Sequence, residues 1–161
     1  MSCNERDDMD VVVQLRKLDT NGKLFAGLNF PAPVPATEAP EDATAKTYGP
    51  QGFLRASSAA SRDEELSSLD GQEVFYRHDR EEKIAPGTIV PLDITLWPMG
   101  MVFAAGEGIM LRVAGHSISE PSVEAMGLEV TDEENLGRHH IHTGGKYDSG
   151  LVLPVVGTNR A

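Results

Sequence analysis

Cysteine, aromatic residues and positive charge are all scarce in this sequence. Cys3 is the only cysteine among 161 residues, which excludes an internal disulfide and a metal site built from paired cysteines. Lysine and arginine number 14 against 25 aspartates and glutamates, so the formal net charge is −11. A chain this acidic repels phosphate backbones and anionic lipid surfaces, and we therefore expect no nucleic-acid or membrane partner.

Long apolar runs are also missing. No stretch approaches the roughly 20 residues that a membrane-spanning helix needs. Residues 2–8 are polar and acidic, where a secretory signal would be basic and then apolar, so we expect a cytoplasmic protein. Within this run we interpret Cys3 as a mobile thiol without a role, and Asp7, Asp8 and Asp10 as a solvated acidic terminus.

Short apolar segments separated by glycine and proline predict an all-β fold. Residues 88–97 place Val90, Leu92, Ile94 and Leu96 on one face by strict alternation. Asn21-Gly22 lies between two apolar runs and predicts a hairpin turn. The expected strands cover residues 10–18, 24–25, 52–56, 88–97, 101–103, 109–114, 139–142 and 151–156. This spacing favours an antiparallel β-sandwich, and we expect residues 1–161 to form one such domain.

Two segments depart from the strand pattern. Residues 31–50 contain five prolines and little apolar surface, which predicts a flexible insert that proteases should cut first. Residues 57–69 are the best helix candidate, although they are rich in serine and weakly amphipathic. The sequence therefore predicts at most one short helix.

The segment Gly115-His116-Ser117-Ile118-Ser119 is close to the G-x-S-x-G elbow of serine hydrolases. The elbow needs glycine on both sides of the serine, because the chain turns sharply there. Here Ser119 occupies the position of the second glycine, and nothing predicts the parallel sheet that an elbow crowns. We interpret the segment as a polar turn and assign no catalytic residue.

The histidines at 139, 140 and 142 form the densest titratable cluster. In a strand, His140 and His142 share one face at a spacing that can chelate a metal. No carboxylate follows at a suitable spacing, so we predict neither a metal nor a cofactor. An alternative is a stand-alone domain that binds or transforms a small molecule. Its candidate ligand-binding residues are His116, His140, His142 and Trp97, although Trp97 also fits a core or interface anchor.

Residues 84–113, which read IAPGTIVPLDITLWPMGMVFAAGEGIMLRV, resemble a known domain. They are similar to the C-terminal domain of Xaa-Pro dipeptidyl-peptidases and cocaine-esterase-like hydrolases, the CocE/NonD family. The shared signature is a Pro-Gly turn, an alternating strand ending in Trp-Pro, a Phe, an Ala-Gly pair and another apolar strand. Residues 8–18, 52–57 and 142–155 resemble other strands of the same domain.

The resemblance implies a jelly-roll β-sandwich that carries no member of a Ser-Asp-His triad. In the family the triad belongs to a separate α/β-hydrolase domain, and the jelly roll shapes the substrate cleft or the oligomer. We therefore expect a homo-oligomer or an α/β-hydrolase partner. The segment Gly106-Glu107-Gly108 resembles the form of this segment in a fungal branch of the family. The chain also starts at a strand that others normally precede, so we expect an N-terminal truncation that leaves residues 11–18 as an unpaired edge.

Without an elbow or a triad, the isolated chain should hydrolyse neither esters nor Xaa-Pro peptides. The measurement is release of p-nitrophenol from a p-nitrophenyl ester by the purified protein. Hydrolysis that disappears in the Ser117→Ala variant would contradict the prediction.

Overall fold

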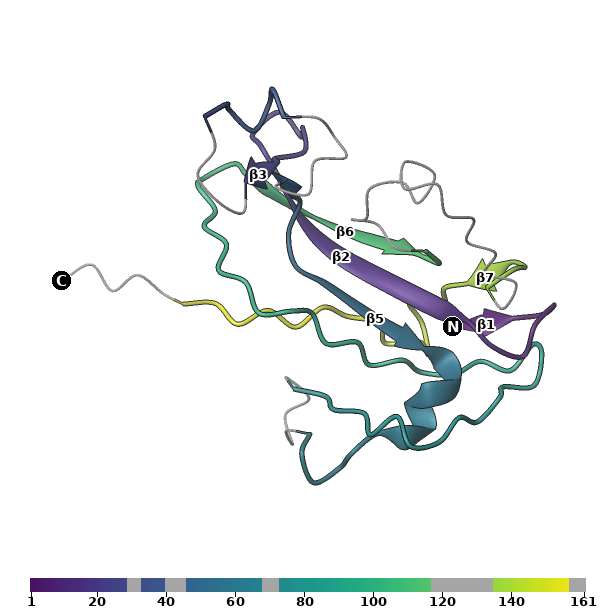
Figure 1. The fold of residues 1–161 in the computed structure, drawn as a ribbon. Coiled ribbons are helices and arrows are strands. Elements are labelled where there is room, and N and C mark those ends of the chain that lie inside the picture. The colour runs from purple at the N-terminus through teal and green to yellow at the C-terminus, as the bar shows by residue number, and fades with distance from the viewer. Residues whose placement is uncertain (29–32, 40–45, 68–72, 117–134, 157–161) are drawn as a thin grey trace.

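The computed structural model describes residues 1–28, 33–39, 46–67, 73–116 and 135–156 (Figure 1). These residues form an all-β fold with antiparallel pairing, as the sequence predicts. The elements are β1 (Ser2–Cys3), β2 (Asp10–Leu18), β3 (Gly27–Leu28), β4 (Lys46–Thr47), β5 (Gln51–Arg55), the 3-10 helix η1 (Ala56–Ser61), β6 (Gly108–Ala114) and β7 (His139–His140). Within the described ranges, no helix has the length and apolar character needed to cross a bilayer.

Strand β2 lies at the centre of a three-stranded sheet with the order β5-β2-β6 (Figure 1). The register pairs Val11 with Leu54, and Leu15 with Leu111. Residues directly opposite each other share a face, so one face of the sheet is almost entirely apolar. Its members are Val11, Val13, Leu15, Leu54, Ile109, Leu111 and Val113. The prediction that residues 11–18 form an open edge is therefore wrong, because β5 and β6 cover both edges of β2.

The turn after β2 forms where Asn21-Gly22 predicts it. The Asp19 carboxylate accepts hydrogen bonds from the backbone N–H groups of Asn21 and Lys23, both at 2.8 Å. Gly22 has φ +78°, a left-handed conformation that glycine adopts without a steric penalty. The returning segment pairs through a single bridge between Leu18 and Leu24. The backbone N–H of Phe25 also donates to the Lys17 carbonyl at 2.9 Å, so the chain returns along β2 where the sequence predicts a strand at residues 24–25, although only by a bridge.

Residues 84–97 run beside β1 and β5 without forming a regular strand. The backbone N–H of Val90 donates to the Met1 carbonyl at 2.9 Å, and that of Trp97 donates to the Gln51 carbonyl at 2.9 Å. The predicted alternation is present, since positions 90, 92, 94 and 96 are half-buried between exposed neighbours. Every second side chain is thus more buried, as in a β-strand, although the backbone hydrogen bonds to the neighbouring strands are incomplete.

The N-terminal residues are ordered into the fold. Strand β1 pairs with β7 in register, so that Ser2 lies opposite His140 and Cys3 opposite His139. The Cys3 side chain is buried and packs in a cluster with Met9 and Ala56. The interpretation of Cys3 as a mobile surface thiol is therefore wrong.

The predicted helix at 57–69 is reduced to η1. At its end, Arg62 takes an extended conformation and bridges to Tyr76. The Asp63 carboxylate then accepts hydrogen bonds from the N–H groups of Glu65 and Leu66, both at 3.0 Å. An aspartate that binds the backbone two and three residues ahead caps a new turn, which competes with helix continuation.

The Pro-rich segment 31–50 is described only in part. Within it, β4 pairs with β3 and returns the chain to the sheet. Residues 31–32 and 40–45 lie outside the described residues, as do Ser117, Ser119 and the acidic run 132–134. The flexibility of the insert and the polar turn at Ser117 therefore stay predictions.

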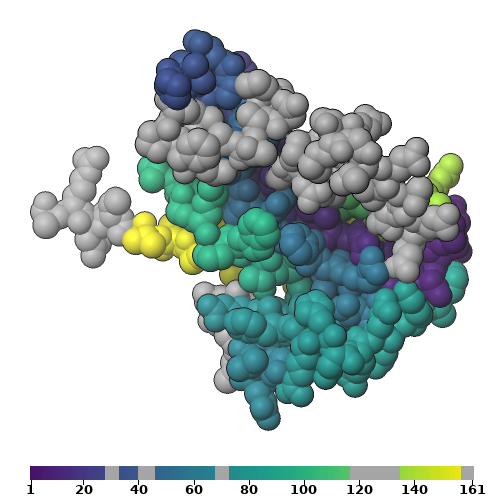
Figure 2. Space-filling view, in the orientation of Figure 1, coloured from purple at the N-terminus to yellow at the C-terminus, as the bar shows by residue number. Residues whose placement is uncertain are grey.

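Of the three strands predicted at 101–103, 139–142 and 151–156, only β7 is present, over two residues. Val102, Val152, Val155 and Val156 are all largely exposed. In the space-filling view, residues 151–156 (yellow) protrude at one side of the molecule (Figure 2). These apolar segments therefore have little cover among the described residues.

Gly52 is required where the chain at residues 94–95 crosses β5. A Cβ atom at this position would overlap the Thr95 carbonyl oxygen and come within 3.1 Å of Ile94 Cγ2. The Gly52→Ala variant should lower the free energy of unfolding by about 1–3 kcal/mol, the usual cost of overpacking. Urea denaturation measures the change. Gly100→Ala is the matched control, because nothing lies within 4 Å of a Cβ there. Equal stability of the two variants would contradict the crossing.

Candidate functional site

Among the described residues, one hydrogen bond joins a serine side chain to a histidine side chain. Ser2 Oγ lies 2.9 Å from His142 Nε2, and the His142 ring packs at 5.0 Å from that of Tyr147. Ser2 is buried, and no hydrogen bond joins His142 to a carboxylate within the described ranges. A nucleophile needs access to substrate and a base that a third group orients. The pair therefore fastens β1 to the segment after β7 and does not form a catalytic centre.

The four residues predicted from the sequence do not converge. His116 and His140 are exposed, His142 contacts Ser2, and no hydrogen bond or ring contact joins any two of these three described residues. Trp97 is 56% exposed and packs edge-on against Phe53, with ring centroids 5.9 Å apart. The described residues contain no group of three potential metal ligands. The described residues therefore do not bring these histidines together, and the alternative function stays a prediction.

A small cavity lies instead at the end of β6. Its lining is Met1, Asp10, Val113, Ala114, Gly115, His139 and Ile141, and its volume is about 130 Å³. His139 Nε2 is buried without a hydrogen-bond partner in the described part of the chain. Typical ligand pockets measure about 300–1,000 Å³, so this cavity is too small for most metabolites.

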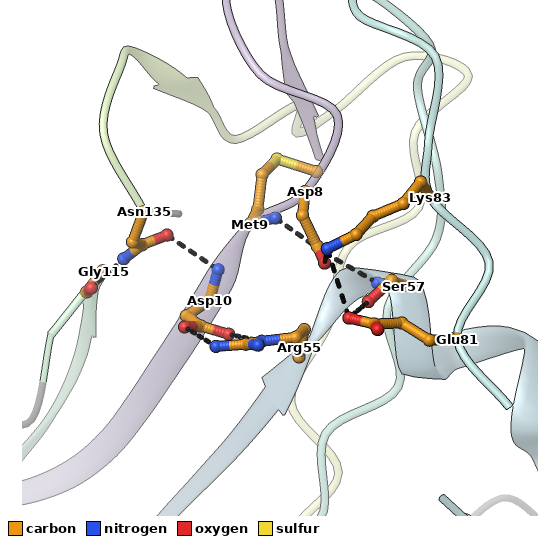
Figure 3. Close-up of polar contacts among 9 residues, drawn as sticks. All are labelled: Asp8, Met9, Asp10, Arg55, Ser57, Glu81, Lys83, Gly115 and Asn135. Atoms are coloured by element: carbon orange, nitrogen blue, oxygen red, sulfur yellow. Dashed lines mark hydrogen bonds and ion pairs between the residues drawn. The ribbon is translucent and has the colours of Figure 1, made fainter. Parts of the chain in front are cut away.

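The most elaborate polar cluster surrounds Asp8 (Figure 3). Asp8 is only 3% exposed, and its Oδ1 accepts hydrogen bonds from the N–H groups of Met9 and Ser57, each at 2.9 Å. Its Oδ2 lies 2.9 Å from Lys83 Nζ. Glu81 completes the cluster by accepting from Ser57 Oγ at 3.1 Å and from Lys83 Nζ at 3.2 Å. One carboxylate thus joins the N-terminal segment, η1 and residues 81–83.

A second cluster lies two residues further along the chain, where β2 begins (Figure 3). Arg55 donates two hydrogen bonds of 2.8 Å to the two carboxylate oxygens of Asp10. The backbone N–H of Asp10 donates to Asn135 Oδ1 at 2.7 Å, and Asn135 Nδ2 donates to the Gly115 carbonyl. Asn135 therefore links the start of β2 to the end of β6.

These contacts overturn the interpretation of Asp7, Asp8 and Asp10 as a solvated terminus. Asp7 is exposed, but Asp8 and Asp10 form ion pairs across the fold. The opposite charges of Asp10 and Arg55 are the one usable signal in the sequence. Both residues lie in predicted strands or next to them, and the pairing of β2 with β5 places them directly opposite each other. No local pattern could identify Lys83 as the partner of Asp8, because 75 residues separate them.

The hydrogen bonds of two buried aspartates shift their titration. Burial alone would raise the pKa of Asp8, but hydrogen bonds from Ser57, Lys83 and the backbone outweigh it and lower this pKa. At Asp63, the hydrogen bond from Arg77 and those from backbone N–H groups lower the pKa to about 2. Both carboxylates are therefore held in the charged form, which suits a structural role more than proton transfer.

Acid should destabilise the protein because these two pKa values are lower in the folded chain than in the unfolded one. The contribution is complete above the unfolded value, about 3.9 for aspartate, and is lost as the pH falls towards 2. The urea midpoint should thus fall between pH 5 and pH 2.5. A midpoint that does not change over this range would contradict the assignment.

The Asp8→Asn variant separates the contribution of Asp8 from that of other acids. At pH 7 it should lose about 2 kcal/mol, as expected for hydrogen bonds to a charged group, and its acid dependence should be shallower. Asp7→Asn is the matched control, because Asp7 is exposed and its removal should leave the midpoint unchanged.

The chain is similar to a hydrolase of known structure. Two crystal structures of a CocE/NonD family hydrolase from Staphylococcus aureus are similar to the chain, each with a TM-score of 0.56. The sequence identities are 30% and 29%, over 74% and 75% of this chain. The chain spans 20% of the length of that hydrolase in both cases. None of the curated proteins matches the sequence.

Residues 1–152 match a family described as the X-Pro dipeptidyl-peptidase C-terminal non-catalytic domain. The match includes β1 to β7, both aspartate clusters and the segment 84–97. The resemblance of residues 84–113 to this domain is thereby confirmed. The chain belongs to the X-Pro dipeptidyl-peptidase C-terminal non-catalytic domain family.

Proposed function

We propose that this chain acts as the non-catalytic β-sandwich domain of a CocE/NonD serine hydrolase and contributes to its substrate cleft or subunit contacts. The observation that carries the proposal is the family match over residues 1–152. The absence of a serine–histidine–carboxylate arrangement within the described residues supports it. Catalysis then requires an α/β-hydrolase partner, and the lone cysteine favours a cytoplasmic location.

The exposed aromatic pair is the best candidate for a contact with substrate or partner. Phe53 is 61% exposed, and its ring meets that of Trp97 at an interplanar angle of 78°. Backbone pairing holds the main chain at both positions, because Phe53 lies in β5 and the Trp97 N–H donates to the Gln51 carbonyl. Large, rigid aromatic side chains bury much surface at low entropic cost, which suits a recognition surface.

The resemblance also favours a branch within the family. In Gly106-Glu107-Gly108, the first two residues precede β6 and Gly108 begins it, and the glutamate pairs with Lys17 at 2.7 Å. This form looks like the fungal branch. The pair fixes the turn against β2, so the Glu form has a structural reason in this chain.

A fluorophosphonate probe, which labels nucleophilic serines, tests directly whether the partner and not this chain carries the catalytic serine. The purified chain should remain unlabelled, whereas the α/β-hydrolase that functions with it should be labelled at its nucleophilic serine. Covalent labelling of this chain alone would overturn the proposal.

Steady-state kinetics of the complete hydrolase test the aromatic pair. If Trp97 lines the cleft, Trp97→Ala should raise KM at least about fivefold and leave kcat unchanged, the usual effect of losing an anchoring aromatic residue. Val102→Ala is the control, because Val102 is exposed and makes no contact with the pair. An unchanged KM in the Trp97→Ala enzyme would exclude the pair from the cleft.

A further inference from the structure

Strand β6 has one paired edge and one open edge among the described residues. Its backbone pairs with β2 from Gly108 to Ala114, and no other described strand hydrogen bonds to it. The strand is seven residues long and nearly apolar. Proteins normally guard such an edge with charge, proline or a bulge, because it offers a template for another strand. Arg112 is the only charged residue in β6.

The apolar face of β6 is also incompletely covered. Ile109, Leu111 and Val113 point to the same face and are 45%, 44% and 37% exposed. Their partners across β2, Lys17, Leu15 and Val13, are less exposed, and Leu15 is buried. The exposed apolar surface therefore increases from the centre of the sheet towards the open edge.

The charge near this edge permits a second copy to approach. Each chain carries a net charge of −11, which opposes self-association in general. Around β6, however, the described carboxylates are paired: Glu107 lies 2.7 Å from Lys17, and Asp10, which lines a cavity with Val113 and Ala114, lies 2.8 Å from Arg55. Arg112 adds a positive charge, and the strand contains no acid. Among the described residues, this edge therefore presents no unpaired carboxylate to a second copy.

We propose that β6 pairs with β6 of a second copy about a two-fold axis at Leu111, so that two three-stranded sheets join into one six-stranded sheet. The inference rests on the proposed role in subunit contacts and names the strand that makes them. In an antiparallel pair centred there, Leu111 faces its own copy and Ile109 faces Val113. All seven residues of β6 then find a partner, and the apolar face continues across the axis.

Other registers are less favourable. A two-fold axis at Arg112 would place two like charges directly opposite each other, which destabilises a strand pair. An axis at Met110 would place Val113 opposite Glu107, whose carboxylate is already held by Lys17. A register shifted by one residue would also turn the apolar face of one copy towards the opposite side of the sheet. Charge and periodicity thus select the axis at Leu111.

Sedimentation velocity on the full chain at micromolar concentration tests the proposal, and charge swaps at Leu111 test the register. The wild-type chain should be dimeric, and its dimer should become tighter from low to physiological salt as repulsion between acidic copies is screened. Leu111→Lys and Leu111→Glu should each weaken association at least about tenfold, because like charges meet at the axis. An equimolar mixture of the two variants should restore the dimer, which also shows that both variants are folded.

Val102→Lys is the control, since it adds the same charge at an exposed residue outside β6 and should leave the dimer intact. A monomeric wild-type chain, a dimer that persists in Leu111→Lys, or a mixture no more dimeric than its components would overturn the proposal. So would a dimer that dissociates as salt rises. None of these outcomes affects labelling by the fluorophosphonate probe, so failure here is distinguishable from failure of the proposed function.

Discussion

Hydrogen bonding on both edges of β2 is the constraint to which the rest of the structure is tied. The strand joins β5, from the first half of the chain, to β6, from the second half. Its start carries Asp10, whose side chain binds Arg55 of β5 and whose backbone reaches β6 through Asn135. Because the register fixes which side chains share a face, a shift of one residue would separate Asp10 from Arg55 and place apolar residues in water.

Ionisable residues in this domain hold distant segments together. The acidic chain has excess carboxylates, and two of the described ones accept hydrogen bonds from three separate donors. Asp8 and Asp63 do so with the backbone and with a basic side chain. A carboxylate saturated in this way has little capacity left for substrate. The domain offers apolar and aromatic surface to its surroundings, which agrees with its membership of a non-catalytic family.

Local patterns identify those elements whose geometry is set by near neighbours. The strands β2, β5 and β6 lie where branched and alternating apolar residues predict them, and Gly22 makes the turn that its sequence context indicates. The alternating burial of residues 90–96 is also correct, although a full ladder is missing. Period and turn chemistry are therefore sufficient for these features.

Pairing between distant residues could not be predicted in the same way. Ser2 contacts His142 across 140 positions, and Asp8 contacts Lys83 across 75. An acidic run next to a lone cysteine looks solvated when only its own composition is considered. The helix expected at 57–69 fails for a related reason, since the carboxylate of Asp63 binds the backbone ahead of it and ends the helical segment.

The position of Cys3 gives the molecule a built-in kinetic reporter. Its thiol is buried where β1 meets β7, and no second thiol in the chain competes for a reagent. A thiol reagent can reach the sulfur only when this two-residue pairing opens, so the modification rate reports the population of the open form when reclosing is fast. Separation of the N-terminal residues from the sheet can thus be followed by the mass of the reagent adduct, without any substitution in the chain.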